Sequence, residues 1–506
     1  MNDMLKLRLR QGDLIGAVVP VGNEEQTVRC WQGIPYAQPP VGMGRWRPPG
    51  PAPHWSGVRA ATLFGSDCPQ PPGRPSRAPC AQEDCLYLNV WALPNAAIDS
   101  PCPLMVWVHG GGFVGGSGAD PRCDGARMAL DGVVVVTFNY RTGLLGYLAH
   151  RQLSRESADR VSGNYGLLDQ MAALAWVQEN IAAFGGDPSR VTVFGVSAGS
   201  ASISLLLVCP PARGLFQQAI LHSPGAGRPL ASLDEAERAG ASLGEDMATL
   251  RSLSTNALLG LTPKLVPKVR ALTAPRILRP IRDGWLLPED ERPALNTGRF
   301  HAMPIIVGSN SDEGSLLTAS RPIDTLKDLQ ELIQSNFADG AEDATRYYLA
   351  SSDADAHGKV AELFADTQFN YGTRLLAQAF CGREPRTWRY LFTRRAEGAK
   401  DGPHHGDEVA YVFGNLAPMI VEQTDLVANE KTPRYADADH CVSTAMRLAW
   451  VQFAKTADPN GPHCVQWPRY RCAQDLALEF GDELRVHARW RADKLDFLER
   501  FFADRG

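Results

Sequence analysis

The residues with the clearest chemical potential lie around Ser197, in the pattern Gly-Val-Ser-Ala-Gly at 195–199. An apolar β-branched run, 191–194, precedes the pattern, and a stretch that is compatible with a helix follows it. Strand, sharp turn and helix form the context of a nucleophile elbow, in which the glycines leave room for a strained turn that exposes the serine hydroxyl. A free serine is a weak nucleophile at neutral pH. The motif therefore does chemistry only if the chain also supplies a base, an acid and an oxyanion-binding loop.

Three consecutive glycines at 110–112, preceded by His109 and followed by Phe113, are the candidate oxyanion-binding loop. Backbone N–H groups in such a loop can approach an anion without a side chain in the way, and each donor is worth about 3–4 kcal/mol of transition-state stabilisation. A flexible turn and a phosphate loop are the alternatives, but the lysine that a Walker motif requires does not follow. The serine motif farther along the chain favours the oxyanion interpretation. In this interpretation, the N–H groups of Gly111, Gly112 and Ala198 are the donors to the oxyanion.

Candidates for the acid and the base lie downstream of the serine. An apolar run at 304–307 leads into a turn that carries Asp312 and Glu313, and a later segment carries His404 and His405. From the residues alone, either carboxylate is compatible with a solvated turn. The histidine pair is compatible with a weak metal site, although no third ligand is evident. We therefore predict no metal.

The elements that must position these residues follow from hydrophobic periodicity. Leu174, Val177, Ile181 and Phe184 recur at steps of three and four and predict a helix over 169–184, with Asp169 near its start, where a carboxylate suits the helix dipole. Strands that alternate with helices predict an α/β protein with a mostly parallel sheet. Short apolar runs predict strands at 104–108, 133–138, 191–194, 219–221 and 304–307.

The bulk composition is that of an ordinary globular protein. The 506 residues are 44% hydrophobic and 21% charged, with a net charge of −5, which gives no reason to expect nucleic acid as a partner. No apolar run reaches the ~18 residues of a membrane helix. The first 21 residues lack the apolar core of a signal peptide, so we expect a cytoplasmic protein without a membrane partner. The 11 cysteines form no C-x-x-C pair, which weakens zinc and redox interpretations.

No linker interrupts the chain, so we predict a single domain over 1–506. Two ranges, around 227–300 and 316–400, are rich in helix formers and charge. We interpret them as helical insertions that cover one end of the sheet and form a pocket wall. The sequence predicts no oligomeric state.

Several motifs together make the chain resemble the type-B carboxylesterases, the family that includes cholinesterases and bacterial p-nitrobenzyl esterases. The resemblance extends over most of the chain and does not depend on one motif. The motifs that carry it are Gly33–Ala37, Glu83–Val90, His109–Phe113, Asn139–Arg141, Gly163–Gln170, Phe184–Pro188, the serine motif at 195–199 and Trp467–Tyr470.

The resemblance implies an α/β-hydrolase fold, with a central, mostly parallel sheet flanked by helices. It also implies hydrolysis of small to medium carboxylic esters through an acyl-serine, without a cofactor. In this family the acid is a glutamate before glycine and the base is a histidine before glycine. These roles fall on Glu313 and His405, with Ser197 as the nucleophile. Ser223 is similar to a serine that supports the triad, although an ordinary turn serine is an equal alternative.

The chain departs from the family pattern at several positions. Val196 stands where the family usually has a glutamate, and this predicts an altered imidazole pKa or altered water entry rather than loss of activity. Cys68 and Cys85 match a family disulfide, but Cys80 lies between them and a reducing compartment would keep them as thiols. Residues 69–84 contain no aromatic residue that could bind choline, so cholinesterase specificity is not expected.

Two other functions remain open at this point. A carbamate or amide hydrolase would use the same triad, so sequence alone does not separate it from an esterase. A non-catalytic, cholinesterase-like binding protein belongs to a different class. The presence of Ser197, Glu313 and His405 argues against that second alternative.

Overall fold

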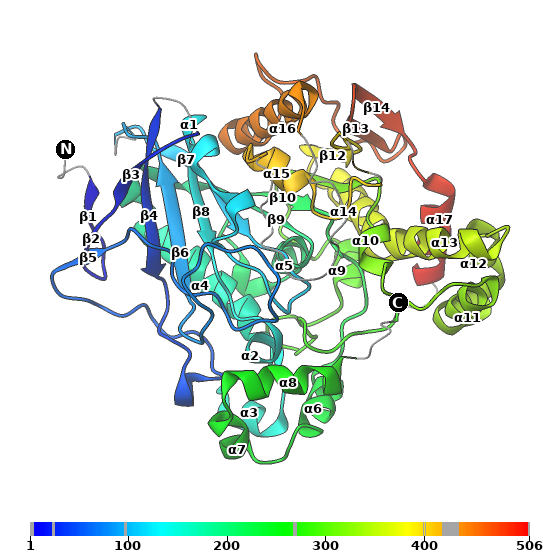
Figure 1. Ribbon diagram of the computed structural model, residues 1–506, viewed down its shortest axis with the longest axis horizontal. Helices are drawn as coiled ribbons and strands as arrows, with labels where there is room; N and C mark the ends of the chain where they lie inside the picture. The colour runs from blue at the N-terminus through cyan, green and yellow to red at the C-terminus, as the bar shows by residue number, and fades with distance from the viewer. Residues whose placement is uncertain are drawn as a thin grey trace.

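A sheet of eleven strands is the central feature among the residues that the computed structural model describes, which are 5–22, 26–95, 99–266, 271–397, 399, 401–416 and 435–503 (Figure 1). Its spatial order is β14-β13-β12-β11-β10-β9-β7-β8-β6-β4-β3. The strands are β3 (Ala17–Pro20), β4 (Thr27–Pro35), β6 (Tyr87–Ala92), β7 (Cys102–Val108), β8 (Val134–Phe138), β9 (Gly186–Val196), β10 (Gln218–His222), β11 (Ile305–Asn310), β12 (Thr387–Phe392), β13 (Leu476–Phe480) and β14 (Leu484–Ala488). A separate small sheet holds β1 (Lys6–Arg8), β2 (Asp13–Ile15) and β5 (Val58–Ala60).

The middle of the large sheet is parallel, from β8 through β7, β9, β10, β11 and β12 to β13, and only its two ends are antiparallel. Each of the five predicted strands overlaps one of these parallel strands. The prediction of a mostly parallel α/β sheet is therefore confirmed.

Helices cover both faces of the sheet. Packing of α4 and α5 against β9, of α14 against β11 and β12, and of α16 against β7 and β9 creates two cores. The helices are α1 (Ala126–Leu130), α2 (Gly143–Tyr147), α3 (Arg151–Glu156), α4 (Tyr165–Asn180), α5 (Ala198–Leu207), α6 (Leu233–Ala241), α7 (Met247–Ser252), α8 (Thr255–Leu265), α9 (Glu291–Thr297), α10 (Ser315–Thr318), α11 (Leu326–Phe337), α12 (Ala341–Tyr347), α13 (Asp353–Ala365), α14 (Tyr371–Cys381), α15 (Glu408–Phe413), α16 (Asp437–Thr456) and α17 (Ala492–Ala503).

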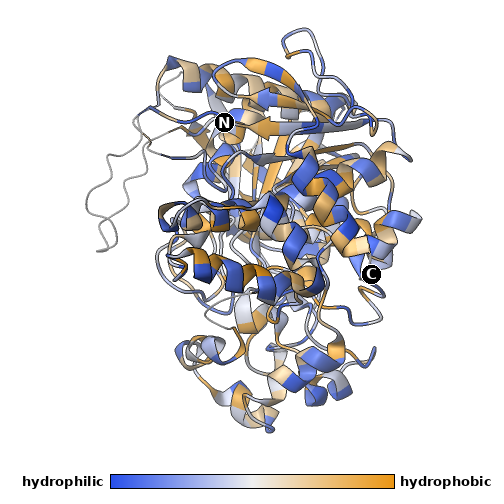
Figure 2. Cartoon of the chain, turned by 90° about the vertical axis from the view of Figure 1, so that its right-hand side faces the viewer, coloured by the Kyte–Doolittle hydropathy of each residue, from blue (hydrophilic) through white to orange (hydrophobic). Residues whose placement is uncertain are grey.

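Alternate residues of each parallel strand enter opposite cores. In β7, Val106 packs into the core with α4 and α5, whereas Trp107 packs into the core with α15 and α16. Because both faces are covered, these strands are apolar at successive positions. Figure 2 shows the resulting hydrophobic strands enclosed between helices whose outer faces are hydrophilic.

The helix that was predicted over 169–184 begins one turn earlier, at Tyr165, and its last residues form a 3₁₀ turn. Asp169 consequently lies inside the helix and not at its N-terminus, where it could interact with the positive end of the helix dipole. Its carboxylate is completely buried and accepts two hydrogen bonds from the Arg141 guanidinium, at 2.8 and 2.7 Å. The partner of this carboxylate is distant in sequence, which explains why helical periodicity did not find it.

The two ranges that were interpreted as insertions contain several helices, α6–α9 in 227–300 and α10–α14 in 316–400. The second range also contains β12, a strand of the central sheet that the sequence interpretation missed. Its sequence, Thr-Trp-Arg-Tyr-Leu-Phe, carries the aromatic and β-branched enrichment typical of a strand. No helix in the described ranges is long and apolar enough to cross a membrane.

Candidate active site

The candidate site lies at the carboxyl ends of neighbouring parallel strands, the edge at which α/β sheets commonly bind ligands. The glycine loop follows β7, Ser197 follows β9, Ser223 follows β10 and Glu313 comes shortly after β11. Residues that are far apart in sequence meet here because parallel strands all end at the same edge.

Ser197 occupies a strained turn between β9 and α5, with φ 56° and ψ −119°. A β-carbon on Gly199 would lie 2.0 Å from the carbonyl oxygen of Val108, and one on Gly195 would lie 2.6 Å from the same oxygen. Both distances are shorter than any tolerable contact. The glycines of the motif are therefore required because the elbow lies directly against β7.

The glycine loop also has a backbone that favours glycine. Gly111 has φ +125°, and a β-carbon there would lie 2.0 Å from the Gly115 carbonyl oxygen, while Gly112 has φ +66°. Gly111, Gly112 and Ala198 all line the same pocket. Within the described residues, none of their three N–H groups donates a hydrogen bond to the protein. This is the donor set that an oxyanion would need.

His109 anchors this loop. Its ring stacks on Tyr140 with centroids 4.2 Å apart, and its Nδ1 lies 2.9 Å from the Gly110 carbonyl oxygen. The Tyr140 hydroxyl donates to the carbonyl oxygen of His109 at 2.8 Å. Burial lowers the pKa of His109 to about 4, so the ring is neutral at pH 7.

Glu313 and His405 form a buried pair. Nδ1–H of His405 donates to Oε2 of Glu313 at 2.5 Å. The other carboxylate oxygen, Oε1, accepts hydrogen bonds from the Ser223 hydroxyl at 2.5 Å and from the Asn310 backbone N–H at 2.6 Å. These contacts fix the carboxylate and, through it, the orientation of the imidazole. Ser223 thus contacts the predicted acid directly.

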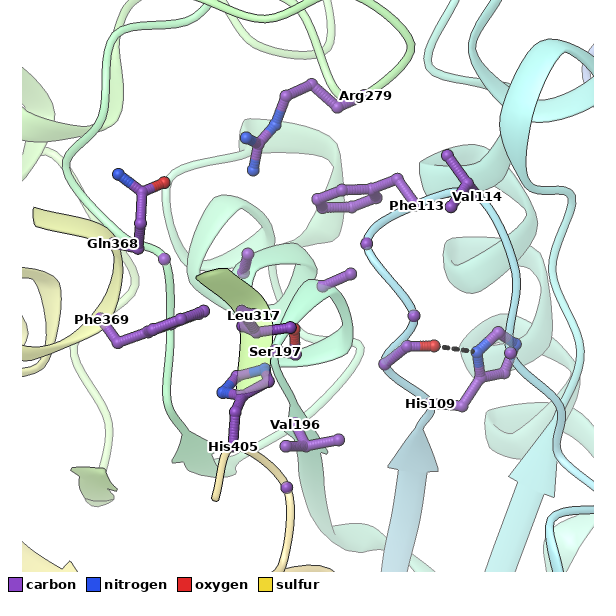
Figure 3. Close-up of a pocket in the computed structure, with 18 of the residues that line it drawn as sticks. His109, Phe113, Val114, Val196, Ser197, Arg279, Leu317, Gln368, Phe369 and His405 are labelled. Atoms are coloured by element: carbon purple, nitrogen blue, oxygen red, sulfur yellow. Dashed lines mark hydrogen bonds between the residues drawn. The ribbon is translucent and has the colours of Figure 1, made fainter. Parts of the chain in front are cut away.

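The remaining ring nitrogen of His405, Nε2, is buried and has no hydrogen-bond partner among the described residues. His405 and Ser197 line the same pocket, and Phe369 stacks on the imidazole with centroids 4.3 Å apart (Figure 3). Burial alone would lower the pKa of His405, but the charge and hydrogen bond of Glu313 outweigh it, so the pKa is raised. The imidazole is therefore oriented and made more basic, with one nitrogen free.

Asp312 and His404 form a separate, half-buried pair beside the first one. His404 Nδ1 lies 3.4 Å from Asp312 Oδ2, and the hydrogen bond to Asp312 raises the pKa of His404. The alternatives that the sequence left open thus have distinct partners, since Glu313 contacts His405 and Asp312 contacts His404. The described residues contain no cluster of three or more His, Cys, Asp or Glu side chains suited to a metal ion.

Glu408 is a residue whose position the sequence interpretation missed. Glu408 begins α15, directly after the histidine segment, and is completely buried. It accepts a hydrogen bond from the Asn310 amide at 2.6 Å and lies 3.4 Å from His222 Nδ1. Although burial alone would raise the pKa of Glu408, these contacts and nearby His405 lower it, and its negative charge in turn raises the pKa of His405.

The buried carboxylate of Glu408 is relevant to position 196, where this chain has valine and the family usually has glutamate. Val196 is buried beside the elbow and supplies no charge. Glu408 provides negative charge near the imidazole from another element. No local pattern distinguishes such a buried glutamate from a solvated one, because its partners come from β10 and β11.

Two further sequence expectations concern cysteines. Cys68 and Cys85 are buried free thiols that lie close enough to interact electrostatically. Cys80, which lies between them in sequence, instead contacts the Ser66 hydroxyl at 3.3 Å. The structure therefore brings the matched cysteines together without a disulfide.

The pocket that contains these groups has a volume of about 810 Å³. Its floor is formed by the elbow, the glycine loop and His405, and its walls include Leu317 and Phe369 from the second insertion (Figure 3). A serine elbow at the carboxyl edge of a parallel sheet, under helical insertions, defines the class of α/β hydrolases.

Comparisons with known proteins identify the family. The Carboxylesterase family matches residues 3–498. The chain is 44% identical over 462 residues to fumonisin B1 esterase of Sphingopyxis macrogoltabida, covering 91% of this chain and 84% of that protein. It is 36% identical over 490 residues to para-nitrobenzyl esterase of Bacillus subtilis (strain 168), covering 92% and 94%. A solved PNB esterase structure superposes with a TM-score of 0.82 at 31% identity, covering 98% of this chain and 100% of that one.

The chain belongs to the type-B carboxylesterase family and has the α/β-hydrolase fold. It is an enzyme of the carboxylesterase class, and its substrates are esters. The resemblance predicted from the motifs is thereby confirmed.

Proposed function

We propose that Ser197, His405 and Glu313 form the catalytic triad and that the enzyme hydrolyses small to medium carboxylic esters through an acyl-serine intermediate. One observation carries the proposal. The buried Glu313–His405 pair leaves a single imidazole nitrogen without a partner among the described residues, at a pocket that also contains the elbow serine. A base in this state is ready to accept the proton of a nucleophile.

In the first half-reaction, Ser197 Oγ attacks the ester carbonyl carbon and its proton moves to His405 Nε2. The carbonyl oxygen becomes an oxyanion that accepts hydrogen bonds from the N–H groups of Gly111, Gly112 and Ala198. When the tetrahedral intermediate collapses, the bond to the alcohol oxygen breaks. The leaving alcohol takes the proton from His405, and the acyl group stays on the serine.

In the second half-reaction, water attacks the acyl carbon and gives its proton to His405. The bond to Ser197 Oγ breaks, the carboxylic acid leaves, and the serine regains its proton from the imidazole. Glu313 stabilises the imidazolium in both halves, and Ser223 and Asn310 hold Glu313 in position. No cofactor is needed at any step.

The names of the relatives support ester bonds as the target, since one is called fumonisin B1 esterase and the other para-nitrobenzyl esterase. The pocket volume of about 810 Å³ lies in the range of small-molecule sites, which supports a small to medium substrate. A carbamate or amide hydrolase would use the same catalytic groups, so this alternative becomes an outcome of the test.

The test compares 4-nitrophenyl acetate with 4-nitroacetanilide as substrates, together with organophosphate labelling followed by mass spectrometry. We expect nitrophenol release, little nitroaniline release, and a single label on Ser197 that Ser197→Ala removes. His405→Ala should abolish turnover, whereas the matched variant His404→Ala should keep it. Faster amide than ester hydrolysis, a label elsewhere, or equal losses in the two histidine variants would each contradict the proposal.

A further inference from the structure

Arginine side chains converge on the pocket that contains Ser197. Among the described lining residues, the single carboxylate is Asp120, although the chain as a whole has a net charge of −5. The sign of the charge inside the pocket is thus opposite to that of the whole molecule. The arginines that line the pocket are Arg74, Arg122, Arg228, Arg276, Arg279 and Arg321.

Asp120 cancels only a small part of this charge. Its carboxylate binds the neighbouring Arg122 guanidinium, with Nη2 at 2.7 Å and Nε at 3.2 Å. Glu291 is a second carboxylate close enough to interact electrostatically with Arg228 and Arg279. It is buried behind the wall, and it accepts hydrogen bonds from the Gly227 N–H at 2.6 Å and from a serine hydroxyl. Within the described lining, positive charge therefore remains in excess.

Two of the guanidinium groups are held close together. The side-chain oxygen of Gln368 accepts a hydrogen bond from Arg276 at 2.6 Å and another from Arg228. An amide oxygen is neutral, so it orients these like charges without neutralising them. Arg228 also donates to the Gly225 carbonyl oxygen and Arg276 to the Ala271 carbonyl oxygen, and these acceptors are neutral too. Two like charges held this close gain from an anion that binds beside them, because a planar guanidinium matches the geometry of a carboxylate.

Arg279 extends the positive wall toward the glycine loop. Its guanidinium lies 5.1 Å from the ring centroid of Phe113, the residue that directly follows the three glycines. Figure 3 shows Arg279 and Gln368 above the level of Ser197 and directed into the same cavity. Anion-binding groups therefore lie on the pocket wall, facing the space above the predicted nucleophile.

We infer that this pocket takes carboxylic esters that carry additional carboxylate groups, which the arginines on the wall bind in the planar, two-pronged geometry that suits carboxylates. The inference rests on the triad proposed above, since it concerns which ester reaches Ser197. The apolar part of the wall around Phe369 and Leu317 holds the carbon chain, and the arginines hold the charged ends. The positive pocket also attracts such substrates from solution.

The first test uses two matched pairs of substrates. In one pair the carboxylate is in the acid part, as 4-nitrophenyl hydrogen glutarate against methyl 4-nitrophenyl glutarate. In the other pair it is in the alcohol part, as 4-acetoxybenzoate against its methyl ester. We expect kcat/KM to favour the charged member of at least one pair by about tenfold or more, the size expected for a charge-assisted hydrogen bond. The pair that responds tells which part of the ester faces the arginines.

The preference should shrink with salt. Raising the ionic strength from ~0.01 M to ~1 M shortens the Debye length from ~30 Å to ~3 Å and removes long-range attraction. The neutral members of the pairs should change little. A charged preference in neither pair would overturn the inference, while hydrolysis of the neutral esters would still support the proposed triad. Failure to hydrolyse any of the four would contradict the triad itself.

The second test uses Arg276→Gln and Arg279→Gln, with Arg485→Gln as a control. Arg485 lies on β14 with a 64% exposed side chain and pairs with Glu483. Each pocket variant should lower kcat/KM for the charged ester about tenfold and should leave the neutral ester within about twofold. The control should change neither value. Equal losses on charged and neutral esters would show a structural role only and would overturn the inference.

Discussion

Replacement of Glu313 by glutamine tests the buried acid–imidazole pair most directly. Oε1 of Glu313 accepts two hydrogen bonds, from the Ser223 hydroxyl and the Asn310 N–H. The amide oxygen of a glutamine has to occupy that side, because an NH₂ group there would face two donors. The NH₂ group then faces Nδ1 of His405 and requires this nitrogen to be an acceptor. The ring proton moves to Nε2, so the imidazole loses its role as a base toward Ser197.

The size of the effect follows from these contacts. Reversing the amide leaves two buried donors unsatisfied at about 1–3 kcal/mol each, which is about 2–6 kcal/mol in total. Since 1.4 kcal/mol corresponds to a factor of ten, the productive tautomer falls to between about 1 in 30 and about 1 in 10⁴. The variant also loses the negative charge that stabilises the imidazolium. We therefore expect kcat/KM to fall by about 10³ to 10⁴.

The assay is kcat/KM for 4-nitrophenyl acetate as a function of pH, with Asp312→Asn as the matched control. Asp312 is the adjacent carboxylate, but it pairs with His404. In the wild type, activity rises with pH through the pKa of His405, because the base must be neutral, and Glu313 raises this pKa. Removing the charge of Glu313 lowers the pKa of His405. The rising limb of the pH profile of the variant should therefore shift to lower pH.

Three results would refute this reasoning. The first is a glutamine variant that retains more than about a tenth of the wild-type activity, which is far more than a wrong tautomer would leave. The second is a pH profile in which the activity of the variant rises at a higher pH than that of the wild type. The third is a control, Asp312→Asn, that loses as much activity as Glu313→Gln. Thermal unfolding of all three proteins identifies any loss that comes from misfolding.

Two further predictions concern the elbow and the support of the acid. Gly199→Ala should abolish ester hydrolysis and lower Tm, since its β-carbon would lie 2.0 Å from the Val108 carbonyl oxygen. The control, Gly260→Ala, places its β-carbon in open space within a helix and should stabilise the protein by up to about 1 kcal/mol. Thermal unfolding and the nitrophenyl ester assay check both, and an active Gly199→Ala enzyme would contradict the steric argument. Ser223→Ala removes one hydrogen bond to the Glu313 carboxylate and should lower kcat about tenfold with little change in KM. An unchanged kcat would assign Ser223 to the turn alone.

Several features of the fold and site follow from short stretches of sequence. The apolar runs predicted the parallel strands because strands buried on both faces must be apolar at successive positions. The elbow followed from two glycines around a serine, because this pattern is contained in five adjacent residues, although the contacts that require the glycines come from Val108 of β7. Helix boundaries were less accurate, since α4 starts at Tyr165 and not at Asp169.

The sequence by itself determined the family, the elbow and the chain order of the candidate triad, because each depends on short motifs and on their order along the chain. Only the tertiary structure decided that the carboxylate of Glu408 is buried near His405 and that Asp169 pairs with Arg141. It also decided that six arginines from five segments of the chain line one pocket. Burial and charge convergence depend on the packing of distant segments, and no local pattern encodes which distant side chains will share a dry, enclosed space.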